Sequence, residues 1–143
     1  MSLHSIQPVG IPDSNHQIPL ANSRVSAGFP SPADDYVERH LDLNEKLIRH
    51  PSATFLMKVE GDSMINAGMQ DGDLLIVDRA IQPAPGKIVI AAVNGELTVK
   101  RLTLYQGCYW LQPENPKYRP IPLDESNDCF VWGVVSHIIH NCA

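Results

Sequence analysis

Two residues in this sequence, Ser63 and Lys100, have the types and surroundings for nucleophilic catalysis. Ser63 follows Gly61 and Asp62 at the end of an expected strand and opens an expected helical turn. A hydroxyl at such a corner lies beside the first backbone N–H groups of the helix, which have no carbonyl partner within the helix. These N–H groups can stabilise an oxyanion. From spacing alone, however, the simpler interpretation that Ser63 only caps a helix carries more weight.

A serine nucleophile needs a base, and none of the six histidines lies in a pattern that predicts this role. A lysine kept neutral by burial is the alternative. Lys58 and Lys100 both fall within expected strands; Lys58 is local to the turn, whereas Lys100 follows a hairpin and can reach across a sheet. The simpler interpretation of either strand lysine is a solvent-facing charge that blocks aggregation.

Metal and thiol chemistry have weaker support. His137, His140 and Cys142 are potential ligands, but no second ligand pair has zinc-like spacing. The three cysteines are an odd number without a CxxC pair, which favours free thiols in a reducing compartment over a disulfide framework. We therefore expect no metal site and no cofactor.

The rest of the chain predicts a mainly β fold. Asn94-Gly95 is a strong two-residue hairpin turn, because both positions tolerate positive φ. Short strands with tight turns favour a curled antiparallel sheet or partly open barrel with one or two short helices. The expected strands are 54–59, 73–77, 88–93, 96–102, 108–112 and 130–139, and 63–67 is an expected helical turn.

The N-terminal quarter differs from the rest. Residues 1–34 contain five prolines and lack helical periodicity, so we expect a flexible arm in which Ile18 to Leu20 can pair as an edge strand. A helix is expected over residues 34–50, ended by Pro51. Residues 35–143 then form the β-rich domain.

Charge and hydropathy limit the partners. The chain of 143 residues has a net charge of −5 and no lysine or arginine run longer than a pair, which disfavours direct binding of nucleic acid. Its longest apolar stretch, residues 88–93, is too short to span a bilayer, and the N-terminus lacks the pattern of a secretory signal. We expect a cytoplasmic protein without membrane contact.

Three segments in order carry a resemblance to a known family. They are Gly61-Asp62-Ser63-Met64, the run from Asp71 to Asp78, and Gly95-Glu96-Leu97-Thr98-Val99-Lys100. Together, and with the lysine 37 positions after the serine, they closely resemble the self-cleaving LexA/UmuD family of serine peptidases over roughly residues 25–140.

Within that family the chain is most similar to the UmuD-like members. The segments from Phe29 to Val37 and from His50 to Thr54 resemble those members rather than the LexA-type repressors. The repressors also carry a helix-turn-helix domain, for which this sequence offers no room ahead of its arm. The resemblance therefore does not imply sequence-specific DNA binding.

The resemblance implies roles for particular residues. Ser63 would be the nucleophile and Lys100 the general base, while the backbone N–H groups of Ser63 and Asp62 would form the oxyanion hole. The bond cut would be Ala27-Gly28 in the arm, where small residues let the backbone approach the nucleophile closely.

The resemblance also implies partners. Cleavage would be stimulated by the RecA filament on single-stranded DNA that forms after DNA damage, a shift of population toward a docked arm. The shortened chain would form a homodimer and act as accessory subunit of a UmuC-like error-prone translesion DNA polymerase.

Three other functions remain open on the sequence. One is a non-catalytic dimeric β-rich module that regulates a polymerase or repressor and whose serine and lysine are vestigial. Another is a peptidase that acts on other proteins, like the signal peptidases that share a Ser-Lys dyad, although no anchor is seen. The last is a fragment of a phage-type repressor, which the UmuD-like arm disfavours.

Overall fold

The computed structural model describes residues 7–8, 17–21, 24–30, 37–124, 126 and 128–143. The chain divides into two compact units, one of Met1–Gly10 with His50–Ala143 and one of Ile11–Arg49. None of the helices among the described residues has the length and apolar character that crossing a bilayer requires.

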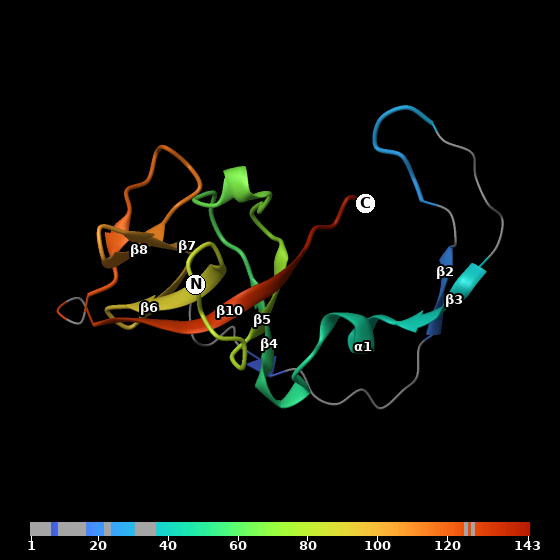
Figure 1. Cartoon of the computed structure of the whole chain (residues 1–143), viewed down its shortest axis with the longest axis horizontal. Helices are drawn as coiled ribbons and strands as arrows, with labels where there is room; N and C mark the ends of the chain where they lie inside the picture. Colours follow the sequence, from blue (N-terminus) through green and yellow to red (C-terminus); the bar gives the residue numbers. More distant parts are fainter. Residues whose placement is uncertain (1–6, 9–16, 22–23, 31–36, 125, 127) are drawn as a thin grey trace. The chain divides into compact units, whose positions relative to one another are not determined.

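In the described part of the first unit, eight strands form one curled, half-barrel sheet in which every neighbouring pair is antiparallel (Figure 1). The mainly β prediction is therefore confirmed. Across the sheet the order is β1 (Gln7–Pro8), β4 (Thr54–Lys58), β5 (Leu74–Asp78), β10 (Cys129–Ile139), β6 (Ile88–Val93), β7 (Glu96–Tyr105), β8 (Cys108–Gln112) and β9 (Ile121–Pro122). The 3₁₀ helix η2 (Pro51–Ala53) precedes β4, and η3 (Ile65–Ala67) lies between β4 and β5.

The hairpin between β6 and β7 has the expected turn. Asn94 has φ of 51° and Gly95 has φ of 82°. Both central residues therefore have the positive φ of the two-residue turn that matches the right-handed twist of the flanking strands. The turn sets the register in which Val89 lies opposite Lys100. It thereby fixes which residues of β7 are buried.

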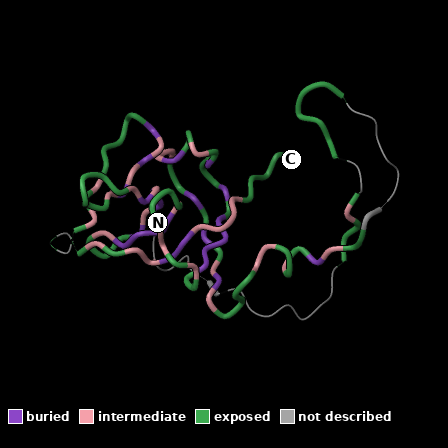
Figure 2. The backbone as a smooth tube through the Cα atoms, viewed as in Figure 1, coloured by how far each residue is buried: buried purple, intermediate pink, exposed green. Residues whose placement is uncertain are grey.

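Two apolar clusters pack the sheet, and Figure 2 shows the buried segments concentrated in its strands. Alternate residues of β6 belong to different clusters, so this strand is covered on both faces. The buried members of the first are Met57, Val59, Met64, Met69, Leu75, Val77, Ile90, Ala92, Leu97 and Val99. Those of the second are Val89, Ala91, Leu102, Leu111 and Val134.

The long strand β10 shifts register twice, once against β6 and once against β5. Gly133 ends the first shift, between Val131 and Gly133. A Cβ atom built on Gly133 would lie 2.8 Å from Cγ1 of the fully buried Val77. Glycine at this bulge therefore allows β10 to approach β5 closely.

We expect Gly133→Ala to lower the free energy of unfolding by about 1–3 kcal/mol, because the added methyl group would overlap the side chain of the fully buried Val77. Urea unfolding at neutral pH measures the change. Gly28→Ala is the matched control, since a Cβ there meets nothing within 4 Å and should change stability by less than about 0.5 kcal/mol. Equal effects of the two substitutions would contradict this account of the bulge.

The second unit corrects one expectation. Strand β2 (Gln17–Ala21), which contains the expected edge segment, pairs antiparallel with β3 (Val37–Asp42). The helix expected over residues 34–50 is wrong for residues 37–42, because pairing with β2 overrides the local preference. Of the described residues 37–50, only α1 (Leu43–Leu47) is helical. Asp42 accepts a hydrogen bond from the Asn44 N–H, which starts α1 after the strand. The expected domain boundary between 34 and 35 lies outside the described residues.

Candidate active site

Ser63 lies in a sharp turn between β4 and η3. Gly61 has φ of 93°, and its N–H donates to Oδ1 of Asp71 at 2.8 Å, which holds the turn. The 3₁₀ helix begins at Ile65, two residues later than expected, and its cap residue Met64 makes no side-chain capping hydrogen bond. The interpretation of Ser63 as a helix cap is therefore wrong.

The Ser63 side chain instead meets Lys100 of β7. The Lys100 Nζ atom lies 3.1 Å from Ser63 Oγ, within hydrogen-bond distance. The same Nζ donates to Thr98 Oγ1 at 2.8 Å and to the Val99 carbonyl oxygen at 3.1 Å. Three oxygens thus fix the end of the lysine side chain against the serine.

Burial controls the charge of this lysine. Lys100 is only 6% exposed and lies opposite the fully buried Val89. Among the described residues it makes no ion pair with a carboxylate. Removal from water disfavours the ammonium form and lowers the pKa of Lys100 below the ordinary lysine value. A neutral amine within reach of a hydroxyl can act as a general base.

The competing base candidates lie elsewhere. Lys58 is exposed on β4, as the simpler interpretation of a strand lysine expects. Within the described part of the chain, no histidine is hydrogen bonded to Ser63. His50 instead contacts Asp78 at 2.6 Å, and His140 contacts Asp73 at 2.7 Å.

The potential metal ligands near the C-terminus have other contacts or are exposed. The His137 ring contacts the Ser136 hydroxyl, and Cys142 is exposed. In the part of the chain that the structure describes, no three His, Cys, Asp or Glu side chains gather as they would around an ion.

Sequence reasoning missed the segment after β8. The Glu114 N–H donates to the Ser63 carbonyl oxygen at 2.8 Å, so this segment supports the turn from a distant part of the chain. Neither the Asp62 nor the Ser63 N–H donates to another group among the described residues. Thr98 was also missed, although its position two residues before Lys100 on the same strand places both side chains on one face.

Comparison with known proteins identifies the family. The sequence model of the Peptidase S24-like family matches residues 19–136. The chain belongs to this family. Among its relatives, Protein ImpA of Salmonella typhimurium is 49% identical over 130 residues, which are 90% of this chain and 87% of that protein. Protein MucA of Escherichia coli is 44% identical over 124 residues, 85% of this chain and 84% of that protein.

The LexA repressor of Shewanella woodyi is 39% identical over 119 residues, which are 82% of this chain and 58% of that repressor. The resemblance to the LexA/UmuD family is therefore confirmed, and this S24 chain is a UmuD-like member of a serine peptidase family.

The expected cleavage bond of this S24 chain lies in the second unit. Ala27 and Gly28 are both exposed. The Gly28 N–H donates to the Ser26 Oγ at 3.2 Å, and a Cβ on Gly28 would meet nothing within 4 Å. Both residues of this bond are therefore at the surface of this unit.

Proposed function

We propose that this S24 chain is a self-cleaving serine endopeptidase of SOS mutagenesis that cuts its own Ala27-Gly28 bond. Ser63 is the nucleophile and Lys100 the general base. The observation that carries the proposal is the 3.1 Å separation between Ser63 Oγ and the Nζ of a buried lysine. A hydroxyl that faced only solvent or a helix end would have no such partner.

The reaction follows from these atoms. Neutral Lys100 takes the proton of Ser63 Oγ as this oxygen attacks the carbonyl carbon of Ala27. The C–N bond to Gly28 then breaks, and the ammonium of Lys100 gives its proton to the leaving amine. An ester of residues 1–27 with Ser63 remains. Water attacks this ester while Lys100 accepts a proton from it, and release of residues 1–27 restores the Ser63 hydroxyl.

The developing negative charge lies on the Ala27 carbonyl oxygen. The N–H groups of Ser63 and Asp62 are the proposed oxyanion hole, since both are free of acceptors among the described residues. Loss of one such donor typically costs about 10²–10³ in rate. No metal or cofactor is required for any of these steps.

The wider role rests on the UmuD-like relatives, which support a part in SOS mutagenesis. In the proposal, residues 1–34 are the flexible arm and residues 35–143 the peptidase and dimerisation domain of a cytoplasmic protein. A RecA filament on single-stranded DNA favours cleavage, and the product from Gly28 onward forms a homodimer that serves a UmuC-like polymerase. The chain makes no sequence-specific DNA contact of its own.

The trigger is tested at about pH 7.5, where most lysines are protonated. Intact mass is measured with and without RecA, ATP and single-stranded DNA. The proposal expects masses for residues 1–27 and 28–143 that accumulate at least about tenfold faster with the filament. A chain that stays whole with the filament and also at about pH 10 would contradict self-cleavage and favour the non-catalytic dimeric module.

A further inference from the structure

The turn that carries Ser63 is held by the segment Pro113 to Tyr118, which follows β8. The Glu114 N–H donates to the Ser63 carbonyl oxygen at 2.8 Å, and the Glu114 carbonyl oxygen accepts from the Asn66 N–H at 2.9 Å. These two backbone hydrogen bonds lie on either side of Met64. They join two segments that are about fifty residues apart in the sequence.

Asn115 adds a buried side chain to this attachment. It is 9% exposed, and its Nδ2 donates to the Asp62 carbonyl oxygen at 3.0 Å. Its Oδ1 accepts from the Lys117 N–H at 3.1 Å, so both ends of the amide are used. Because Asp62 immediately precedes the nucleophile, this hydrogen bond fixes the peptide whose N–H is proposed to face the oxyanion.

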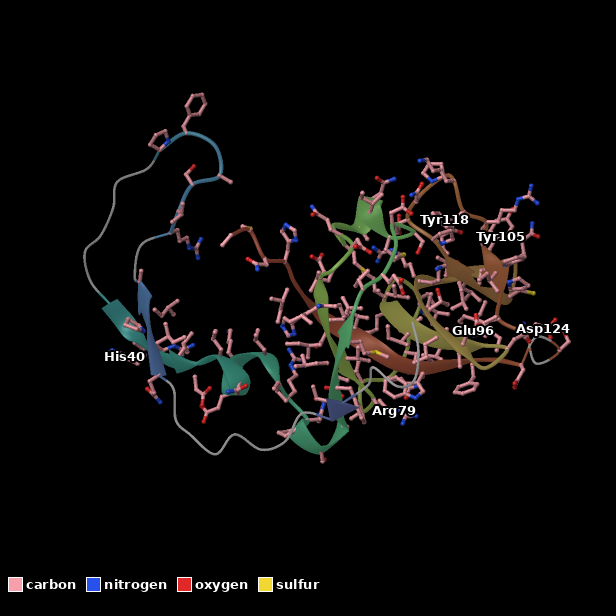
Figure 3. All side chains as sticks on the ribbon, turned by 180° about the vertical axis from the view of Figure 1, so that it is seen from behind. His40, Arg79, Glu96, Tyr105, Tyr118 and Asp124 are labelled. Carbon is pink, nitrogen blue, oxygen red and sulfur yellow. The ribbon has the colours of Figure 1, made fainter. Side chains whose placement is uncertain are left out.

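Tyr118 binds the side chain of the same residue. Its hydroxyl donates to Asp62 Oδ1 at 2.5 Å, and Figure 3 shows Tyr118 on the segment that leaves β8. The Asp62 carboxylate, through this hydrogen bond and its charge, raises the pKa of Tyr118. The phenol therefore keeps its donor proton into the alkaline range.

The same segment also reaches the strand that carries the base. Arg101, the residue after Lys100, donates from Nε to Glu114 Oε1 at 2.5 Å and from Nη1 to the Gly86 carbonyl oxygen at 2.6 Å. Glu114 is therefore bonded both to the Ser63 backbone and to the neighbour of Lys100. Nucleophile and base are joined through one short segment as well as through their own contact.

We infer that Asn115 and Tyr118 are positioning residues that hold Asp62 and Ser63 in the geometry needed for cleavage. The inference rests on the proposed function, because it assigns a role in that reaction. Among the described residues, neither side chain is hydrogen bonded to Ser63 Oγ or Lys100 Nζ; both act through Asp62. Small displacements of a nucleophile can cost up to about a hundredfold in rate.

Tyr118→Phe and Asn115→Asp are the test variants. The first removes one hydroxyl, and the second replaces the Nδ2 donor by an oxygen that cannot donate when ionised, at nearly unchanged volume. We expect the plateau of the rate at high pH to fall about tenfold in each variant. For Tyr118→Phe, which introduces no charge, the pH at half of the plateau should stay the same, since the burial of Lys100 is unchanged.

The measurement is the first-order rate of appearance of the 28–143 mass across pH, together with thermal unfolding. Tyr109→Phe is the matched control, because Tyr109 is 45% exposed and Tyr118 is 44% exposed. This substitution should leave the cleavage rate and the unfolding temperature unchanged. If Asn115→Asp fails to fold, Tyr118→Phe alone decides the inference.

The outcomes separate this inference from the proposed function. A wild-type chain that stays whole overturns both. Wild type and Tyr118→Phe cutting at equal plateau rates overturn the inference alone. So does a lower rate that comes with a shifted pH midpoint and a lower unfolding temperature, because that result indicates a general loss of structure.

Discussion

Replacing Ser63 or Lys100 by alanine is expected to lower the rate of self-cleavage at least about a thousandfold. Ser63→Ala removes the hydroxyl oxygen that lies 3.1 Å from the Lys100 Nζ, so no acyl ester with residue 63 can form. Lys100→Ala leaves the hydroxyl without a base. Because the two residues act as a unit, the double variant should be no slower than either single variant.

Lys58→Ala is the matched control for the lysine, since Lys58 is an exposed strand lysine of the same sheet. It should cut at the wild-type rate, measured by intact mass over time. Thermal unfolding of Ser63→Ala and Lys100→Ala should show that both variants remain folded. A Lys100→Ala chain that cuts as fast as Lys58→Ala would refute the role of the dyad.

The second large effect is that of pH. Only neutral Lys100 can accept the serine proton, and its fraction rises about tenfold per pH unit below the pKa. The rate should therefore rise by this factor from neutral pH and level off at the pKa of Lys100, which burial places below the ordinary lysine value. A pH at half of the plateau that lies below about 10.4 is the expected sign of the buried amine.

The same burial has a consequence for stability. The unfolded chain binds a proton on Lys100 up to its ordinary pKa, whereas the folded chain releases it at a lower pH. This residue therefore makes the free energy of unfolding rise with pH between the two values. Urea unfolding of Ser63→Ala across pH, compared with the control Ser63→Ala/Lys100→Met, measures the contribution of Lys100 to the pH dependence of the free energy of unfolding. Equal pH dependence of the two chains would contradict this contribution.

Much of the sheet could be predicted from local sequence. The strands at 88–93 and 108–112 have the expected bounds, and Asn94-Gly95 has the expected backbone. Strand alternation and turn residues are local signals, which explains this agreement. Residues 37–42 were misassigned because their conformation depends on pairing with β2, a contact that no local pattern contains.

In the candidate site, too, some residues could be predicted from the sequence and others depend on tertiary contacts. Ser63 and Lys100 could be singled out by residue type and by resemblance, and the structure brings them together. Asn115 and Tyr118 could not, because they act on Asp62 across 53 and 56 residues of sequence. The Ser63 side chain also lacks the capping role that its local context suggests, since tertiary contact with Lys100 decides its partner.

The most direct test of the central claim is intact mass spectrometry of the wild-type chain after incubation at about pH 10, beside Ser63→Ala and Lys100→Ala. We expect the wild type alone to give two products, residues 1–27 and residues 28–143. A wild-type chain that stays whole at about pH 10 and also with RecA, ATP and single-stranded DNA, or a cut that persists in Ser63→Ala, would contradict the claim.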